Sequence, residues 1–349
     1  MSNEDYIDEV ELTEEIPTSA ELTVIIPSHF RGERLDKSLA ACISQYSRSK
    51  IQTWIDANLV RYESGKFAQI KDQITGEQTL FVTIPEDPQN KAFNPENIPL
   101  EIVYSDSSIA LINKPAGLVV HPAAGNWSGT LLNALLYHFP ECSQVPRAGI
   151  VHRLDKDTSG LLVVAKSLIA QTHLVRQLQS RTVSRRYLAL VWGTPPLNKT
   201  INAPIGRDPR DRLKMAVTQG PSAKEAITSF TVLQTVPFDS RSISLIECKL
   251  QTGRTHQIRV HLQHLGYPLL NDPVYHVKAP LQIQKLLMDN FYGDEAVTIP
   301  GQMLHATQLG LIHPDSEEEK IWSRSPPIAF LKLMADLGFQ ERAWQHLLN

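Results

Sequence analysis

The chain places a group of polar side chains between two apolar runs near its middle. The stretch "HRLDKDTSG" (152–160) follows Ile150 and Val151 and precedes the apolar run "LLVVA". Because Asp, Thr, Ser and Gly are common in turns, one interpretation is a solvent-facing turn between two strands. The alternative is that the strands hold the loop rigid, with Thr158 and Ser159 bonded to the loop backbone so that one carboxylate is fixed. A rigid carboxylate beside an arginine suits nucleophilic or acid–base chemistry on a sugar.

A second polar cluster, "TGRTHQIRVH" (252–261), fits a helix that carries Thr255, Arg259 and Leu262 on one side. Arg259 would then point inward toward a sheet. A buried charge without a partner is very costly, so an inward Arg259 requires a carboxylate, and Asp155 is the obvious candidate. The alternative is that Arg254 and Arg259 bind phosphates at the surface.

A third cluster, "SRRYLALV" (184–191), fits a strand on which Tyr187 shares one face with Ala189 and Val191. A tyrosine in that setting is usually a core residue whose hydroxyl is hydrogen-bonded. A role for Tyr187 in a functional site is the alternative that the strand pattern leaves open.

The sequence does not predict a metal site or a nucleotide cofactor. Three histidines lie near one another at positions 256, 261 and 264, but the chain contains neither HExxH nor closely spaced Cys and His residues. Its three cysteines lie far apart and show no CxxC spacing, which argues against a disulfide framework. GxxxxGK[ST] and GxGxxG are missing as well. We therefore expect no metal and no cofactor.

Charge is distributed unevenly along the 349 residues, although the net charge is only −3. Residues 1–20 carry seven carboxylates and no Lys or Arg, whereas residues 141–261 carry 18 Lys and Arg against 8 Asp and Glu. Residues 31–71 carry 8 against 4. Two basic blocks fit a surface that follows phosphates, and ordinary solvated faces are the alternative interpretation.

The apolar segments and the first residues predict a soluble cytoplasmic protein. No apolar run approaches the roughly 20 residues that a membrane-spanning helix needs. The acidic stretch "MSNEDYIDEVELTEEIP" has the composition of neither a secretory signal nor a transit peptide. We expect no membrane partner.

Composition and periodicity divide the chain into four parts. We expect an acidic disordered tail over 1–20, a small α/β unit over 21–85, a linker over 86–99, and a catalytic body over 100–349. In the small unit, apolar spacing predicts one helix near 33–43 and another that begins at Ser47 or Ser49.

The body alternates strands with helices. Its predicted helices are "SGTLLNALLYHF", "AQTHLVRQLQSR" and "THQIRVHLQHLG". Its predicted strands are "LEIVYSD", "IALINKP", "AGIVHRL", "GLLVVAKS", "RRYLALVWG", "AITSFTVLQTV" and "SISLIECKLQTG", of which the last two would pair antiparallel. The fold class is therefore α+β with a mixed, largely antiparallel sheet.

Several of these motifs together resemble a known family. "GIVHRLDKDTSGLLVVAK" (149–166) closely resembles the signature of RluA-type RNA pseudouridine synthases. Further matches follow in the family's order: "INKPAGLVVHP" (112–122), "RRYLALVWG" (185–193), "GRTHQIRVHL" (253–262) and "LHATQLGLIHP" (304–314). The unit over 21–85 looks like an S4 RNA-binding domain, and the whole arrangement is most similar to RluD-like members, which act on large-subunit (23S) ribosomal RNA.

The resemblance implies a reaction and roles for individual residues. The family breaks the N1–C1′ bond of a flipped-out uridine and rejoins the base through C5, without a metal or a cofactor. Asp155 matches the catalytic aspartate, through either nucleophilic attack or a glycal. Tyr187 matches the tyrosine against the uracil, a candidate base for the C5 proton, and Arg259 matches the partner of the aspartate. Arg153 matches the residue that enters the RNA stack.

The remaining expectations concern RNA binding and the target. We expect Arg34, Arg48 and Lys50 of the S4-like unit to bind the RNA backbone. In the body we expect His152 and Arg254 to contact RNA. The partner would be large-subunit ribosomal RNA or a pre-ribosomal particle, and the protein would act as a monomer. A different ribosomal or transfer RNA uridine, or a non-catalytic ribosome-assembly role, are the alternatives.

Three departures from the family pattern leave the target uridine open. The chain reads Asn271-Asp272 where many relatives read "GD", its segment 60–66 is longer than usual, and 276–300 resembles an insertion.

Overall fold

The computed structural model describes residues 21–84, 92–123, 125–211, 214–275, 281–291 and 301–348. The predicted acidic tail lies outside these residues, as do residue 85, part of the predicted linker (86–91) and parts of the expected insertion (276–280 and 292–300). The chain divides into two compact units, residues 1–90 and 91–349, each with its own hydrophobic core. Among the described residues, no helix is both long and apolar enough to cross a membrane.

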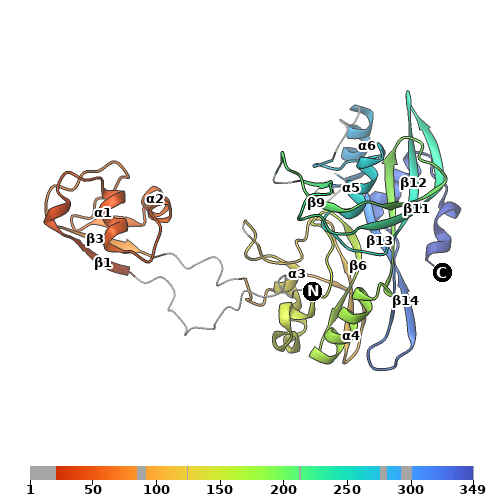
Figure 1. Ribbon diagram of the computed structural model, residues 1–349, viewed down its shortest axis with the longest axis horizontal. Coiled ribbons are helices and arrows are strands. Elements are labelled where there is room, and N and C mark those ends of the chain that lie inside the picture. The colour runs from red at the N-terminus through yellow and green to blue at the C-terminus, as the bar shows by residue number, and fades with distance from the viewer. Residues whose placement is uncertain are drawn as a thin grey trace. The chain divides into compact units, whose positions relative to one another are not determined.

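The first unit packs two helices against a three-stranded antiparallel sheet with the order β1-β3-β2 (Figure 1). Ser47, one of the two predicted caps, accepts a hydrogen bond from the Lys50 N–H and so begins the second helix. Leu35, Leu39 and Ile51 are fully buried between helices and sheet, as their helical spacing predicts. The elements are β1 (Glu21–Ile26), η1 (Ser28–Phe30), α1 (Leu35–Cys42), α2 (Arg48–Asp56), β2 (Val60–Tyr62) and β3 (Gln78–Thr83).

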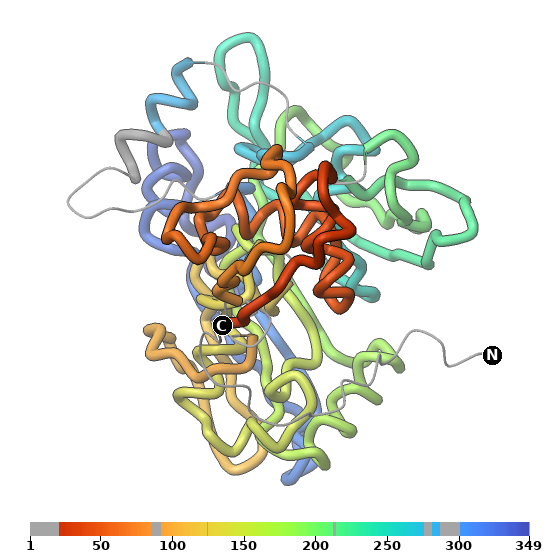
Figure 2. Tube along the Cα trace, turned by 90° about the vertical axis from the view of Figure 1, so that its left-hand side faces the viewer, coloured from red at the N-terminus to blue at the C-terminus, as the bar shows by residue number. Residues whose placement is uncertain are grey.

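The second unit is built on a sheet in which nine strands are found among the described residues. Eight follow the order β4-β5-β6-β13-β7-β12-β11-β8, and β14 pairs with β13. The β13–β6 pair is parallel and the other pairs are antiparallel, which confirms the predicted α+β fold with a mixed, largely antiparallel sheet. The β11–β12 and β13–β14 hairpins extend toward opposite ends of this unit in both views (Figures 1 and 2).

The strands of the second unit are β4 (Glu101–Ser105), β5 (Ile109–Lys114), β6 (Ser159–Ala165), β7 (Ser184–Trp192), β8 (Asn198–Asn202), β9 (Ile205–Arg207), β10 (Met215–Val217), β11 (Ile227–Phe238), β12 (Arg241–Leu250), β13 (Leu304–Ile312) and β14 (Glu319–Ser323). Its helices are α3 (Leu131–His138), α4 (Leu168–Gln179), α5 (Gln257–His264), α6 (Leu281–Phe291) and α7 (Ile328–Asp336).

Strand β6 is buried on both faces, which explains why "LLVVA" is apolar without alternation. Leu162 and Val164 pack into the core formed with α3 and α5. Leu161 and Val163 pack on the opposite face with residues of α4. Each such side chain contributes roughly 1.5–3 kcal/mol of stability, so the segment that follows the polar loop is firmly anchored.

Strand β13 lies between β6 and β7 in the sheet. It therefore connects segments that are distant in sequence. Ala306 pairs with Gly160 at the start of β6 and with Tyr187 in β7. Gly160 has a φ of +114°, and a Cβ at this position would lie 2.3 Å from the Ala306 carbonyl oxygen. The glycine is therefore required for this close approach. The order of the strands therefore places the polar loop before β6 and Tyr187 of β7 on either side of β13.

The predicted strand over "AGIVHRL" (148–154) is wrong. The segment begins in a 3-10 turn (η4, Pro146–Gly149) in which Arg147 and Ala148 adopt φ values of +56° and +50°. Among the described residues, a single isolated bridge, between Ile150 and Val164, links this segment to the sheet. Because left-handed residues cannot continue an extended strand, the chain turns here and leads into the loop instead.

The predicted linker extends too far toward the second unit. Ala92 is buried, and the Asn133 side chain donates hydrogen bonds to the carbonyls of residues 92 and 94. The Glu96 carboxylate accepts from the Gly129 N–H. Residues 92–99 are thus part of the second unit, because a Pro- and Asn-rich composition excludes regular structure but does not exclude packing.

Candidate active site

The loop between η4 and β6 carries Asp155 and is anchored on both sides of it. Leu154 is buried in the core, and the Thr158 N–H donates to the Asp155 carbonyl over 3.1 Å. The Thr158 hydroxyl accepts from the Gln302 amide (2.9 Å), and the Ser159 hydroxyl bonds His305 Nδ1 (2.9 Å). The two hydroxyls were predicted to bond the loop backbone, so that prediction is wrong: they tie the loop to a segment about 145 residues downstream.

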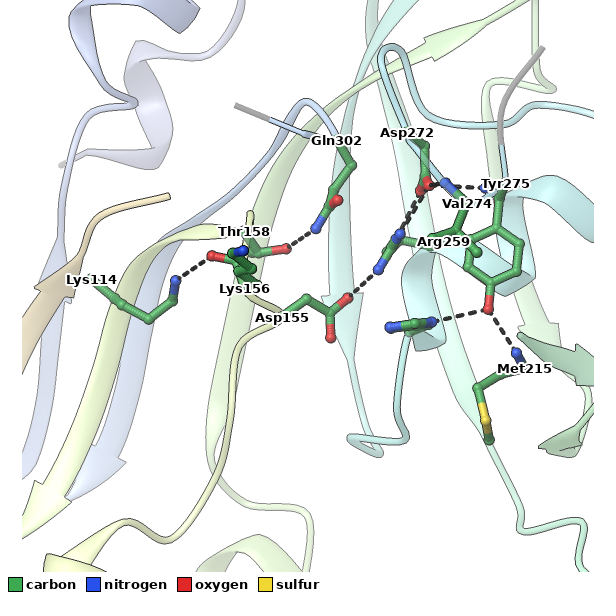
Figure 3. Close-up of polar contacts among 11 residues, drawn as sticks. Lys114, Asp155, Lys156, Thr158, Met215, Arg259, Asp272, Val274, Tyr275 and Gln302 are labelled. Carbon is green, nitrogen blue, oxygen red and sulfur yellow. Dashed lines mark hydrogen bonds and ion pairs between the residues drawn. The ribbon is translucent and has the colours of Figure 1, made fainter. Parts of the chain in front are cut away.

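Lys114 fixes the loop from the opposite side, as Figure 3 shows. Its ammonium is fully buried at the end of β5 and donates to the carbonyls of Pro115, Leu118 and Lys156, over 2.8, 2.9 and 2.9 Å. Burial lowers the pKa of Lys114 to about 7, against the opposing charges of Asp155 and Asp157. Sequence reasoning missed this residue, although a lysine that ends the apolar run "IALIN" is a visible anomaly.

Arg259 points inward and contacts Asp155, which confirms the predicted pair. The Arg259 Nη1 donates to Asp155 Oδ2 over 3.0 Å, and the two side chains are 4% and 16% exposed. The other carboxylate oxygen, Oδ1, accepts no hydrogen bond from any residue that the structure describes. The predicted helix that carries Arg259 is α5. It begins at Gln257 rather than at Thr255, because His256 has a φ of +57° and so lies in the left-handed region.

A second carboxylate, Asp272, holds Arg259 in this orientation. Its two oxygens accept from Arg259 Nε (2.7 Å) and Nη2 (2.9 Å) in a bidentate pair (Figure 3). Burial would raise the pKa of Asp272, but hydrogen bonds from Arg259 and from the N–H groups of Val274 and Tyr275 outweigh it and lower that pKa. Sequence reasoning noted Asp272 only as part of a departure and missed this contact.

Tyr275 covers the open face of the Arg259 guanidinium. The guanidinium carbon lies 5.2 Å from the centre of the Tyr275 ring, within reach of a cation–π interaction. The Tyr275 hydroxyl accepts from the Met215 N–H (2.8 Å) and bonds His256 Nδ1 (3.0 Å). The arginine is therefore confined by two carboxylates and one aromatic ring.

Tyr187 lies on β7 and shares a core face with Ala189 and Val191, as predicted. Its side chain is 5% exposed, and burial raises its pKa to about 12 despite the opposing charge of Arg185. Its hydroxyl makes no hydrogen bond with any of the described residues. This is unusual for a buried tyrosine and favours a role in the site over one in the core alone.

These side chains line one cleft with a cavity volume of about 60 Å³. Asp155 comes from the loop before β6, Tyr187 from β7 and Arg259 from α5. These three elements meet at the cleft, and β13 lies between β6 and β7 in the sheet. The described walls are His152, Arg153, Leu154, Asp155, Thr158, Arg185, Tyr187, Leu250, Gly253, Arg254, Thr255, His256, Gln257, Ile258, Arg259 and Leu304.

Comparisons with known proteins agree with this geometry. A family profile described as RNA pseudouridylate synthase matches residues 108–264, which include the cleft loop, Tyr187 and Arg259. The chain is 47% identical over 315 residues to ribosomal large subunit pseudouridine synthase D of Nitrosomonas europaea, covering 90% of this chain and 87% of that one. The chain belongs to the RNA pseudouridine synthase family. It is therefore an isomerase that forms pseudouridine in RNA.

Further relatives extend the similarity. The synthase is 40% identical over 316 residues to ribosomal large subunit pseudouridine synthase D of Escherichia coli, covering 90% of this chain and 93% of that one. Among solved structures, human RNA pseudouridylate synthase domain containing 4 is 26% identical, with a TM-score of 0.51 and coverage of 68% of this chain and 92% of that one.

The three other predicted residues near the cleft differ in setting. His152 Nε2 accepts the Val163 N–H over 3.1 Å, and burial lowers the pKa of His152 to about 3, so the ring is neutral at pH 7. The Arg153 side chain is exposed and makes no hydrogen bond or ion pair with a described residue. Arg254 is exposed and donates from Nε to the Glu225 carbonyl over 3.0 Å.

Two of the three predicted residues of the first unit, Arg34 and Arg48, contact a buried carboxylate. Arg48 donates to Asp36 Oδ2 over 2.9 and 3.0 Å, and Arg34 donates to both oxygens over 3.1 and 3.2 Å. Asp36 is fully buried, whereas Arg34 and Arg48 remain 47% and 48% exposed. The Lys50 ammonium lies 5.8 Å from the centre of the Tyr46 ring. The arginines are thus oriented and still accessible.

Possible metal ligands do not converge in the described part of the chain. No three His, Cys, Asp or Glu side chains there are placed to share an ion. Of the histidines considered from sequence, His261 bonds Thr228 and the Ala203 carbonyl, and His256 bonds Tyr275.

Proposed function

We propose that the synthase converts uridines of large-subunit (23S) ribosomal RNA to pseudouridine, and that Asp155 is the residue that acts on the nucleotide. The target is suggested by relatives at 40–47% identity that are named ribosomal large subunit pseudouridine synthase D. The role of Asp155 is supported by one observation above all. One of its oxygens is held by Arg259, and the other faces the cleft without a partner among the described residues.

A uridine stacked in RNA cannot present C1′ to this carboxylate, so it must leave the stack at a cost of a few kcal/mol. We propose that Arg153 fills the space that the base vacates, because its cationic side chain is exposed at the cleft and unpaired among the described residues. Stacking of its planar guanidinium and contact with phosphate would offset part of that cost.

The chemistry proceeds by one of two routes. In the first, the Asp155 carboxylate attacks C1′ and uracil leaves with the electron pair of the N1–C1′ bond. In the second, the carboxylate removes the C2′ proton as uracil leaves, which gives a glycal. In both, the base turns and C5 bonds to C1′, while the Asp155–C1′ bond breaks in the first route or C2′ regains its proton from Asp155 in the second. The C5 proton is then lost and N1 gains a proton. Arg259 and Asp272 hold the carboxylate at the reacting carbon throughout.

Tyr187 is proposed to hold the flipped base with its ring. Its role as base for the C5 proton is disfavoured by its pKa of about 12, since the phenol stays protonated near neutral pH. Its unpaired hydroxyl is suited to donate a hydrogen bond to the substrate.

Residues 21–85 are proposed to act as an S4-like RNA-binding domain. The exposed arginines around Asp36 and the nearby Lys50 would bind phosphates, which gives affinity rather than chemistry. His152 and Arg254, as walls of the cleft, would contact the RNA near the flipped nucleotide. We further propose that the protein acts as a cytoplasmic monomer, without metal or cofactor, on ribosomal RNA or a pre-ribosomal particle.

The test is the Asp155→Asn variant assayed for pseudouridine in ribosomal RNA. The substitution keeps the size of the side chain and removes the carboxylate, so we expect a loss of at least about 10³-fold with RNA binding retained. Pseudouridine formation at the wild-type rate would contradict the assigned role. Wild-type protein that binds RNA but never isomerises it would favour an assembly factor, and sites mapped outside large-subunit RNA would correct the target.

A further inference from the structure

Arg185 is a buried cation in the cleft for which neither the fold nor the mechanism above accounts. It lies two residues before Tyr187 on β7, so the two side chains share one face of the strand. The residue is only 6% exposed, yet it forms no ion pair with any residue in the described part of the chain. Its Nε has no hydrogen-bond partner there, and Nη2 donates one long bond of 3.4 Å to the Gln251 carbonyl.

The neighbouring arginines differ from Arg185 in having counter-ions. The Nε of Arg186 also lacks a hydrogen-bond partner in the described part of the chain, so the feature that distinguishes Arg185 is its missing ion pair. Arg186 is more exposed and pairs with Glu247 over 2.9 Å. Arg259 is equally buried but binds two carboxylates. A buried charge without a counter-ion is costly, and burial accordingly lowers the pKa of Arg185. A protein retains such a group where something else supplies the opposite charge.

The surroundings of Arg185 keep its guanidinium in place beside the cleft. A Cβ at residue 253 would lie 2.8 Å from Arg185 Nη1, so Gly253 leaves the space that the guanidinium uses. His152, whose pKa is lowered to about 3, stays neutral beside it and adds no competing charge. Arg185, Tyr187 and Asp155 all line the same cleft.

The reaction creates a negative charge on uracil that Arg259 does not balance, because Asp272 keeps its bidentate pair with Arg259 after Asp155 has given up its own charge. When the N1–C1′ bond breaks, its electron pair stays on uracil and the charge spreads over N1 and the two carbonyl oxygens. We propose that Arg185 binds a carbonyl oxygen of the flipped uracil and stabilises the uracil anion while the base is detached. This proposal rests on the proposed function.

The bond changes balance without a proton from Arg185. The electron pair moves from the N1–C1′ bond to uracil, and it returns when C5 bonds to C1′. The C5 proton then leaves to another acceptor and N1 gains a proton, neither step involving Arg185, so the guanidinium is charged throughout. Because the carbonyl oxygen is neutral in the bound substrate and anionic only after cleavage, the contact strengthens in the transition state and accelerates the step.

The second source of an anionic oxygen is a phosphate of the RNA, and burial argues against it. Arg185 is almost fully covered beside Tyr187, the residue proposed to hold the base, whereas the accessible cations of the cleft are Arg153 and Arg254. A phosphate contact would contribute affinity for RNA in general. A contact with uracil would instead raise the rate of pseudouridine formation.

The test compares Arg185→Gln with Arg186→Gln, its neighbour on the other face of β7. We expect Arg185→Gln to lower the single-turnover rate of pseudouridine formation on a ribosomal RNA fragment about 100-fold, the usual effect of removing one such donor. RNA affinity should change by less than about 3-fold, and Arg186→Gln should act like wild type. A parallel loss of affinity would indicate a phosphate contact and overturn the proposal.

A second substrate separates a chemical from a structural role. The same RNA with 5-fluorouridine at the target releases a base that is a more stable anion, so its cleavage depends less on Arg185. The deficit of Arg185→Gln, measured as consumption of that nucleotide, should shrink at least about 10-fold. An equal deficit on both substrates, or none on uridine, would overturn the proposal.

Two controls keep the outcome interpretable. If Arg185→Gln does not fold, Arg185→Lys replaces it, since it keeps the charge and removes the planar fork. Inactive wild-type protein would contradict the proposed function itself, whereas active wild type with an unimpaired Arg185→Gln would contradict only the inference about Arg185.

Discussion

The two units of the synthase contain ionic clusters of opposite composition. In the first unit, one buried carboxylate, Asp36, holds two arginines that are about half exposed. In the second, one buried arginine, Arg259, holds two carboxylates, of which Asp155 reaches the cleft. Each cluster has three charges, so the first presents a net positive charge to solvent and the second a net negative charge to the cleft.

The difference shows what a buried counter-ion does in each place. Asp36 orients Arg34 and Arg48 without covering them, which suits phosphates that approach from solvent. Arg259 is itself covered and leaves one oxygen of Asp155 available, which suits a single carbon atom of a bound sugar. In both clusters the buried charged group, Asp36 or Arg259, fixes the positions of its partners. The partners of opposite charge, which outnumber it, include the groups that would contact the RNA.

Among the variants that test this comparison of the two clusters, the largest effect should come from replacing Asp272, the counter-ion of Arg259 that does not line the cleft. In Asp272→Asn, Arg259 loses its bidentate partner, so we expect a loss of about 3–5 kcal/mol of stability. Pseudouridine formation should fall about 100-fold as Asp155 loses its fixed position. Urea denaturation and single-turnover assays measure the two effects.

Asp157→Asn is the matched control for this variant. Asp157 lies in the loop of Asp155 and, unlike Asp272, forms no ion pair with a described residue. It should therefore keep most activity and stability. An Asp272→Asn variant as active as this control would show that Arg259 needs only Asp155.

A smaller effect, on binding alone, should follow from neutralising the exposed arginines of the first unit. In the double variant Arg34→Gln and Arg48→Gln, we expect weaker RNA binding and a salt dependence reduced by about one to two phosphate contacts. The single-turnover rate at saturating RNA should match wild type. A lower rate with unchanged affinity would contradict the division of roles between the clusters.

The smallest effect should appear in the dependence of stability on pH. The pKa of Asp272 is lowered from its ordinary value of 3.8, so the unfolded chain binds the proton more readily than the folded one. Its contribution is complete above about pH 5 and is lost as pH falls through the folded pKa. Wild type should lose stability between about pH 5 and pH 3 more steeply than Asp272→Asn. Parallel pH profiles of urea denaturation would contradict this.

Sequence patterns predicted the elements of the fold better than the contacts of the site. The apolar periods located β6, β7 and α5, and the cost of burying Arg259 alone pointed to Asp155. The predicted strand over 148–154 is wrong because Arg147 and Ala148 have left-handed φ values. The residue types in "PRAG" do not predict these values, since neither residue is a glycine.

The residues that sequence reasoning missed have a common cause. Asp272 and Lys114 act through contacts fixed only by tertiary structure: a turn after α5 and three backbone carbonyls. Arg185 stood within a motif, but its lack of a counter-ion among the described residues is visible only when its neighbours are placed. Local periodicity carries no information about which polar groups remain unpaired.

The position of β13 has a consequence for how the enzyme is made. β6 and β7 follow each other in the chain but are separated in the sheet by a strand that is synthesised more than a hundred residues later. The hydrogen bonds of Thr158 and Ser159 likewise cannot form before Gln302 and His305 have been synthesised. A nascent chain that ends before residue 302 therefore holds every residue proposed for catalysis and yet has no finished active site. Such long sequence separation slows folding, and it delays activity until synthesis is nearly complete.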